Sequence, residues 1–320
     1  MTEPFHIVYL ERLSPQALNV VERHLPHGCT FRCLHDGDEA ALLARADALI
    51  AGHYPIVDDG LLNVAPRLKV VQRQGVGYDT VDTDALVHRG IPLAITAGPG
   101  TAEVAEHAVM LMLAVLRDLP RSHEATVGGR WPHVHARTSS RSLRGRRVGI
   151  VGAGRIARAV ATRVAAFEAT CRYWSRGALD RPTERALGLQ WMEPDDLFAW
   201  ADILTLHVPA VPGETMGLIG KQELQLLGND GILVNTARGS LVDEDALVAA
   251  LHSGGIAGAG LDVFVDEPLA AASSVASAPN VVLTPHHAGG TADADEKKLA
   301  FVLANLDAFR RGRQMENRVV

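Results

Sequence analysis

A glycine-rich turn in the middle of the chain restricts the fold more than any other feature of the sequence. Residues 147–160 read Arg-Val-Gly-Ile-Val-Gly-Ala-Gly-Arg-Ile-Ala-Arg-Ala-Val, an apolar run that ends in glycines and continues into a helix-forming stretch. Gly152 suits a tight turn, Gly154 leaves room for a pyrophosphate, and Ala157 lets a helix pack closely on a strand. Because a helix N-terminus favours negative charge, this pattern predicts a βα turn that binds the phosphates of a dinucleotide.

The end of the next predicted strand indicates which dinucleotide is bound. An acidic residue at this position would hold the ribose 2'-hydroxyl of NAD. Here residues 171–174 are followed by Ser175 and Arg176, with no carboxylate. A hydroxyl and a guanidinium can both donate to a 2'-phosphate, which a carboxylate would repel. The sequence therefore favours NADP(H) over NAD(H). The alternative is that Arg176 is a solvated loop residue and NAD(H) is used.

The composition is that of a globular protein with a small-molecule partner. The 320 residues suffice for two domains, and 47% hydrophobic with 21% charged residues excludes disordered and fibrous classes. A net charge of -6 without a basic block argues against nucleic-acid binding. No apolar run can cross a bilayer and no secretory signal is visible, so we expect a cytoplasmic protein without a membrane partner. Cys29, Cys33 and Cys171 show no disulfide or metal spacing, which predicts buried thiols and no metal site.

Predicted strands and helices alternate along the whole chain. Apolar runs predict strands at residues 5–10, 29–34, 48–51, 69–74 and 92–95, and again at 147–152, 171–174, 203–208, 231–236, 258–263 and 281–284. This alternation predicts an α/β fold of two Rossmann-like or flavodoxin-like domains, with doubly wound parallel sheets and an active-site cleft between them.

A long apolar helix at residues 101–117 marks the expected crossing between the domains. We predict a substrate-binding domain at 1–100 plus 288–320 and a dinucleotide-binding domain at 101–287, with a last helix near 291–310. A helix at 243–251 is expected to begin from Ser240. The basic stretch at 137–147 is interpreted as a solvated arm.

Two loops in the first domain follow predicted strands, at the edge where open α/β sheets bind ligands. One contains His53 and Tyr54, which are candidates for substrate contact or ordinary surface residues. The other contains Gly75 and Gly77, whose N–H groups can form an anion nest for a carboxylate. The alternative for that loop is a plain tight turn.

Three polar residues fall just after late strands, so we expect them to line one edge of the sheet. Arg238 can clamp a carboxylate or polarise a carbonyl, and His286 can exchange a proton near neutral pH. Glu267 can fix the tautomer of His286 and stabilise its imidazolium form. Beside a nicotinamide, these groups suit hydride transfer to or from a carbon that bears oxygen next to a carboxylate. Singly, each could be an ion pair, a loop carboxylate or a satisfied histidine, so the prediction depends on their joint placement.

Together these motifs resemble the D-isomer-specific 2-hydroxyacid dehydrogenases. The resemblance rests on segments that extend over nearly the whole chain, and it is weakest in the first seventy residues. Those segments are residues 75–79, 152–157, 207–209, 235–243, 261–268 and 284–286. It implies that Arg238 binds the carboxylate and carbonyl of the substrate, that His286 is the acid/base, and that Glu267 pairs with it.

The resemblance also implies the residues that contact the ligands. For the substrate these are Arg238 and the backbone at Val76 and Gly77, to which the first strand-end loop adds Tyr54. For the dinucleotide they are Thr101, Arg155, Ile156, Val208, Pro209, Thr236, Ala237, Asp262 and His286. The glycine turn adds Gly152 and Gly154 to the dinucleotide contacts, and the end of the next strand adds Ser175 and Arg176.

Two positions depart from the common family pattern. His287 stands where an aliphatic residue often follows the catalytic histidine, and Ser175 replaces the usual acid. The second departure resembles the NADPH-preferring glyoxylate/hydroxypyruvate reductase branch and implies reduction of a small 2-keto acid. The family resemblance further implies a homodimer built through the long helix and the arm that carries Trp131.

Two alternatives to a 2-keto acid reductase use the same fold. One is another family substrate, through oxidation of 3-phosphoglycerate, formate or phosphite. The other is a dinucleotide-sensing regulatory protein, like the corepressors built on this fold, which can retain the catalytic residues with little turnover. A near-zero rate across a panel of keto acids would favour the regulatory protein.

Overall fold

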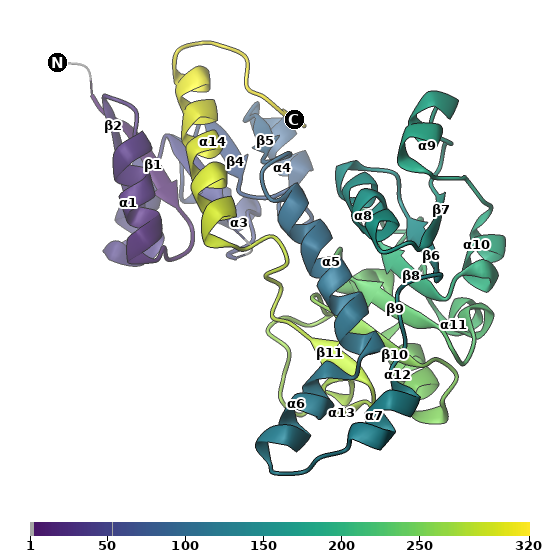
Figure 1. Ribbon diagram of the computed structural model, residues 1–320. Coiled ribbons are helices and arrows are strands. Elements are labelled where there is room, and N and C mark those ends of the chain that lie inside the picture. The colour runs from purple at the N-terminus through teal and green to yellow at the C-terminus, as the bar shows by residue number, and fades with distance from the viewer. Residues whose placement is uncertain (1–2, 53) are drawn as a thin grey trace. The chain divides into compact units, whose positions relative to one another are not determined.

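The computed structural model describes residues 3–52 and 54–320, with only the backbone at 135 and 136, and divides into two compact units (Figure 1). The first unit comprises residues Met1–Gly100 and Gly290–Val320, and the second comprises Thr101–Gly289. His53, a candidate for substrate contact, lies outside the described residues.

A five-stranded parallel sheet forms the centre of the first unit, in the order β2-β1-β3-β4-β5. This is the doubly wound order of flavodoxin-like folds. Its strands are β1 (Phe5–Tyr9), β2 (Cys29–Cys33), β3 (Ala48–Ala51), β4 (Val70–Arg73) and β5 (Leu93–Ile95).

Helices cover both faces of this sheet. Successive residues of a strand point to opposite faces, so Ile7 packs with α1 (Pro15–His24) and α14 (Ala292–Arg310), whereas Val8 packs toward α2 to α4. The bounds of those three helices are Glu39–Arg45, Asp59–Asn63 and Thr83–Arg89, and a short 3-10 turn η1 covers Leu34–Asp36. As the sequence predicts, Ser14 caps α1, with its hydroxyl accepting a hydrogen bond from Ala17 N.

The second unit contains a six-stranded parallel sheet in the order β11-β10-β9-β8-β6-β7. A single-residue bridge between Trp191 and Tyr173 extends the sheet beyond β7. The winding therefore reverses beside β6, as in dinucleotide-binding domains. The strands are β6 (Arg147–Val151), β7 (Thr170–Trp174), β8 (Ile203–Leu206), β9 (Ile232–Asn235), β10 (Gly258–Leu261) and β11 (Val281–Leu283).

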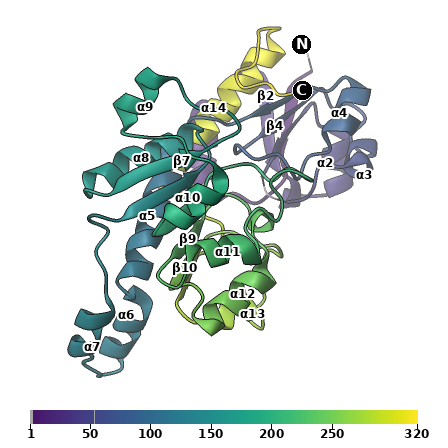
Figure 2. The ribbon, with the colours of Figure 1, turned by 90° about the vertical axis from the view of Figure 1, so that its right-hand side faces the viewer.

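Two hydrophobic clusters lie on the two faces of this second sheet. One packs under α5 (Thr101–Leu116) and α8 (Arg155–Ala166), and the other under α10 to α13 (Figure 2). The latter helices are Pro194–Trp200, Lys221–Leu227, Glu244–Ser253 and Ser274–Ser277, and α9 covers Arg181–Leu187. The α/β class and the doubly wound parallel sheets predicted from the sequence are confirmed. Among the described residues, no helix combines the length and apolar character needed to span a membrane.

Two local predictions are wrong. Ser240 lies in the 3-10 turn η2 (Gly239–Leu241), and Asp243 caps α12 instead, because its carboxylate accepts from Ala246 N at 3.0 Å. Cys29 is only half-buried, because β2 lies at the sheet edge. Two short helices, α6 (Leu119–Val127) and α7 (His133–Ser139), follow α5. The basic stretch at 137–147 begins in the last turn of α7 and is mostly exposed.

Candidate active site

The glycine turn between β6 and α8 has the geometry that a dinucleotide requires. Gly152 has φ of 116°, and a Cβ there would lie 2.5 Å from the carbonyl oxygen of His207. Gly154 is the N-cap of the 12-residue helix α8, and a Cβ there would meet no described heavy atom within 4 Å. The turn therefore leaves open space in front of a helix N-terminus, where backbone N–H groups favour phosphate. Arg155 and Ile156 follow in the first helical turn.

Ser175 and Arg176 follow β7, the second strand after the glycine turn, where dinucleotide-binding domains recognise the ribose 2'-group. Ser175 donates its hydroxyl hydrogen to the Gly177 carbonyl at 2.6 Å. Arg176 forms an ion pair with Glu214 at 3.2 Å, in which the side chains are 80% and 52% exposed. Such an exposed pair contributes about 0–1 kcal/mol, so a 2'-phosphate can compete for Arg176. Sequence reasoning missed Glu214 because it lies 38 residues away in the chain.

Four other predicted dinucleotide residues lie just after strands of the second sheet. Val208 and Pro209 follow β8, and Thr236 and Ala237 follow β9. Thr101 is the first residue of α5. The Thr236 hydroxyl is buried without a hydrogen-bond partner among the described residues. Buried hydroxyls ordinarily have a partner, so this atom is a group that a bound molecule can satisfy.

His207 belongs to the scaffold rather than to the acid/base machinery. Burial lowers its pKa to about 3, and its Nε2 lies 3.0 Å from the Thr205 hydroxyl. The ring is therefore neutral at physiological pH.

The Glu267 carboxylate and the His286 imidazole form a tight pair. His286 Nδ1 and Glu267 Oε2 are 2.6 Å apart, and the other carboxylate oxygen accepts from Phe264 N at 2.9 Å. An ionised carboxylate only accepts hydrogen bonds, so this contact places a proton on Nδ1. The geometry fixes the ring tautomer and leaves Nε2 to exchange a proton.

Arg238 follows β9, the strand next to β10 in the sheet. Its backbone is fixed by the buried Asn235, which donates to the Arg238 carbonyl at 2.8 Å and accepts from Ala237 N at 3.0 Å. The guanidinium donates to the Ala237 carbonyl at 2.7 Å. This hydrogen bond holds the Arg238 guanidinium close to its own loop. The loop lies at the same edge of the sheet as Glu267 and His286.

The turn that carries His286 depends on Asp262. His286 has φ of 50°, in the left-handed region that non-glycine residues rarely occupy. Its backbone N–H donates to the Asp262 carbonyl at 2.8 Å. The Asp262 carboxylate, 1% exposed, accepts from the N–H groups of His287 and Ala288 at 3.0 and 2.8 Å. Asp262, predicted as a dinucleotide contact, therefore holds the His286 turn in the structure.

A histidine that sequence reasoning missed completes this network. The Thr284 hydroxyl donates to Asp262 Oδ1 at 2.6 Å, so it must accept from His107 Nε2 at 2.8 Å. Burial lowers the pKa of His107, and nearby His287 acts in the same direction against the opposing effect of Asp262. The rings of His107 and His287 meet edge to face, with centroids 4.9 Å apart. His287 thus contacts Asp262 and His107, whereas His286 contacts Glu267.

The predicted substrate loops belong to the first unit. Val76 and Tyr54 are 48% and 50% exposed, and Tyr54 N donates to the Glu11 carboxylate at 2.9 Å. Gly75 and Gly77 are not among the positive-φ glycines of the described chain, so their N–H groups are presented by a bend without left-handed backbone at either glycine. Binding of a carboxylate by this loop stays a prediction.

Arg73 is a buried cation beneath this second loop. It is 2% exposed, and its Nη1 donates to the Ala51 carbonyl at 2.9 Å. A Cβ on Gly75 would lie 3.7 Å from that same nitrogen. The positive charge close to the loop favours an anion, although sequence reasoning read Arg73 only as part of a strand.

Comparisons with known proteins agree with this geometry. Residues 109–288 match the family described as "D-isomer specific 2-hydroxyacid dehydrogenase, NAD binding domain". The chain is 37% identical over 271 residues to a glyoxylate reductase of Thermococcus litoralis, covering 83% of this chain and 81% of that one. It is also 40% identical over 264 residues to a D-3-phosphoglycerate dehydrogenase of Mycobacterium leprae, covering 81% of this chain but 49% of that one.

Solved structures with the same fold include enzymes with different substrates. A Granulicella formate dehydrogenase superposes with a TM-score of 0.89 at 26% identity, over 98% of this chain and 97% of that one. An NADPH-dependent glyoxylate/hydroxypyruvate reductase of Sinorhizobium meliloti, in complex with NADP and malonate, gives 0.84 at 32% identity, over 100% and 97%.

Proposed function

Because the chain belongs to the D-isomer-specific 2-hydroxyacid dehydrogenase family, we propose that it reduces a small 2-keto acid of the glyoxylate or hydroxypyruvate type to the D-2-hydroxy acid, with NADPH. The observation that carries the proposal is the 2.6 Å contact between His286 and Glu267 at the sheet edge that also presents Arg238. The NADPH-dependent reductase among the solved neighbours supports the same substrate class.

The roles of the three residues follow from their chemistry. Arg238 binds the substrate carboxylate and polarises the keto group, since its charge is permanent. Protonated His286 donates a proton from Nε2 to the keto oxygen, and Glu267 stabilises the imidazolium before that transfer. When bound, the nicotinamide supplies the hydride that the keto carbon gains. Val76, Gly77 and Tyr54 are the proposed substrate contacts in the first unit.

The cofactor preference is tested by exchanging the residue at the 2'-position. We expect wild type to prefer NADPH, and Ser175→Asp to lower kcat/KM with NADPH by about a hundredfold or more while NADH is retained. The matched control is Ser274→Asp, which adds the same charge at an exposed position of α13, next to β11 at the sheet edge opposite β7. Initial rates with both cofactors on both variants measure the effect. Equal use of NADH and NADPH by wild type would contradict the NADP(H) assignment while leaving the acid/base pair untouched.

A substrate panel tests the reaction itself. Glyoxylate and hydroxypyruvate reduction should proceed, whereas formate and 3-phosphoglycerate oxidation should be slower by orders of magnitude. The phosphoglycerate and formate dehydrogenases among the similar proteins make those two compounds the necessary comparison. If no compound is turned over, the dinucleotide-sensing regulatory function becomes the better explanation.

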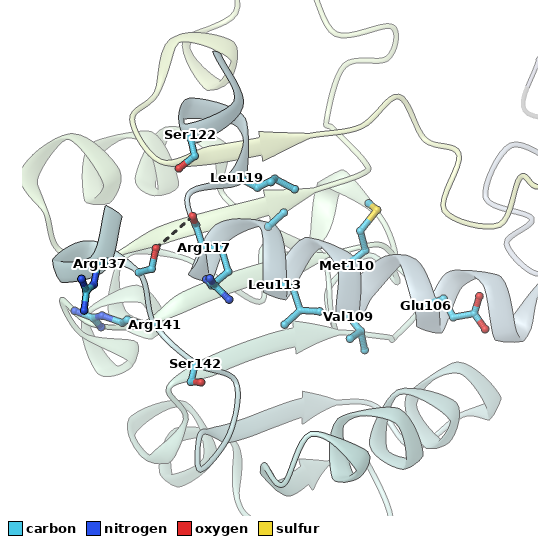
Figure 3. Close-up of a pocket in the computed structure, with 12 residues that line it drawn as sticks. Glu106, Val109, Met110, Leu113, Arg117, Leu119, Ser122, Arg137, Arg141 and Ser142 are labelled. Atoms are coloured by element: carbon cyan, nitrogen blue, oxygen red, sulfur yellow. Dashed lines mark hydrogen bonds between the residues drawn. The ribbon is translucent and has the colours of Figure 1, made fainter. Parts of the chain in front are cut away.

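We also propose a homodimer formed through α5, α6 and α7. A groove of about 1080 Å³ lies along α5 and toward the two short helices, and Figure 3 shows Val109, Met110 and Leu113 of α5 among the residues that line it. Leu119 and Trp131, nearby in the chain, are 57% and 77% exposed. Met110, at 44%, is exposed as well, and large exposed apolar side chains that gather in one region are typical of an interface.

Light scattering tests the dimer. Wild type should have twice the chain mass, and Leu119→Asp should shift the equilibrium toward monomer. Val87→Asp is the matched control, because Val87 is equally exposed, at 58%, on α4 of the first unit. A monomeric wild type at all protein concentrations would refute the dimer.

A further inference from the structure

The peptide between Phe264 and Val265 is held on two sides by the segment that follows Arg238. On one side, a Cβ on Gly239 would lie 1.9 Å from the Phe264 carbonyl carbon and 2.4 Å from Val265 N, so the two backbones are in direct contact. On the other side, Glu244 Oε1 accepts from Val265 N at 2.7 Å. This peptide is therefore clamped between Gly239 and Glu244.

The clamped peptide leads directly to the acid/base pair. Phe264 N, one residue before the bond to Glu244, donates to Glu267 Oε1 at 2.9 Å. Glu267 Oε2 in turn lies 2.6 Å from His286 Nδ1. Hydrogen bonds and one short loop thus connect Glu244 with His286, and a shift of the Phe264–Val265 peptide would move the Glu267 carboxylate.

The surroundings of Glu244 disfavour an ionised carboxylate, so its presence at this position needs an explanation. Burial raises the pKa of Glu244, and Asp266, Asp245 and Glu267 act in the same direction, while the bond from Val265 N opposes them. A solvated acid in the first turn stabilises the N-terminus of α12 equally well through the helix dipole, and exposed Asp245 is such an acid. The half-buried position of Glu244 is explained by the hydrogen bond that it accepts.

We propose that Glu244 is a positioning residue for the acid/base pair: its carboxylate fixes the Phe264–Val265 peptide and thereby holds Glu267 against His286. The inference rests on the proposed 2-keto acid reduction for its kinetic consequence. It concerns a residue that contacts neither substrate nor cofactor in that scheme.

Two substitutions separate the hydrogen bond from the charge. Glu244→Ala removes the acceptor, and we expect kcat to fall about ten- to a hundredfold because small displacements of catalytic groups have effects of that size. Glu244→Gln keeps an oxygen acceptor and should remain within about threefold of wild type in kcat. Neither change should alter the KM of the dinucleotide more than about twofold if only the pair is displaced.

Asp245→Ala is the matched control, because it removes an exposed carboxylate one residue along in the same helical turn. It should behave as wild type. In Glu244→Ala alone, kcat should fall while the KM of the dinucleotide is kept, and Glu244→Gln should restore kcat. If Glu244→Ala matches Asp245→Ala in kcat, the positioning role is wrong although the reductase function stands.

A measurement without turnover distinguishes this failure from a failure of the proposed function. The Nδ1–H proton resonance of His286, assigned by its loss in His286→Asn, reports the 2.6 Å contact with Glu267. It should move toward the position of a weaker hydrogen bond in Glu244→Ala and stay unchanged in Asp245→Ala, even if none of the keto acids is a substrate. An unchanged resonance in Glu244→Ala would overturn the inference independently of any assay.

Discussion

His286→Asn is expected to lower kcat for 2-keto acid reduction by about 10²- to 10⁴-fold, the range over which general acid–base groups contribute. His287→Asn should stay within about threefold of wild type. The adjacent pair is a direct test of which histidine transfers the proton, a question that the sequence leaves open.

The structure supports this division of roles through the partners of each ring. His286 Nδ1 lies 2.6 Å from Glu267 Oε2, whereas His287 Nδ1 lies 3.8 Å from Asp262 Oδ1 and its ring packs on His107. Asp262 is already saturated by donors from Thr284, His287 and Ala288. It is therefore poorly placed to support a change of charge on His287.

Asparagine is the substitution of choice because His286 has φ of 50°. Asparagine tolerates left-handed backbone better than other non-glycine residues, so the turn should survive the change. The melting temperature serves as the control and should change little in either variant. A variant His287→Asn that loses as much activity as His286→Asn would refute the assignment.

The sequence predicted the sheets well because strands of a parallel sheet are buried on both faces. The run Leu49–Ile50 in β3 and the run Leu233–Val234 in β9 are fully buried, and such continuous apolar runs are easy to recognise. Residues that follow such runs must lie at one edge of the sheet. Placing Arg238 and His286 at that edge therefore required no knowledge of distances.

The residues that support the site were missed for the opposite reason. His107 appears as one polar residue in an apolar helix, and its partner Thr284 lies 177 positions away. Glu244 looks like an ordinary first-turn acid, and Glu11 is 43 residues from the loop that it holds. Contacts of this kind depend on tertiary packing, for which a single sequence carries no local signal.

Gly152→Ala is expected mainly to lower stability and Gly154→Ala mainly to weaken dinucleotide binding, although both glycines belong to one turn. Gly152→Ala should reduce the free energy of unfolding by at least about 2 kcal/mol, because it combines a φ of 116° with a Cβ 2.5 Å from the His207 carbonyl oxygen. Dinucleotide binding should be lost along with the turn that it depends on.

At Gly154 a methyl group meets no described atom of the protein within 4 Å, and φ is an ordinary -72°. Stability should change by no more than about 1 kcal/mol, the usual cost of alanine at an N-cap. The methyl would instead occupy the space in which a pyrophosphate approaches the backbone, so the dinucleotide Kd should rise about tenfold or more, which corresponds to 1.4 kcal/mol or more. Chemical denaturation and fluorescence titration on both variants measure the two effects separately. If Gly154→Ala binds the dinucleotide as tightly as wild type, the open space before α8 is not the phosphate site, whatever Gly152→Ala does to stability.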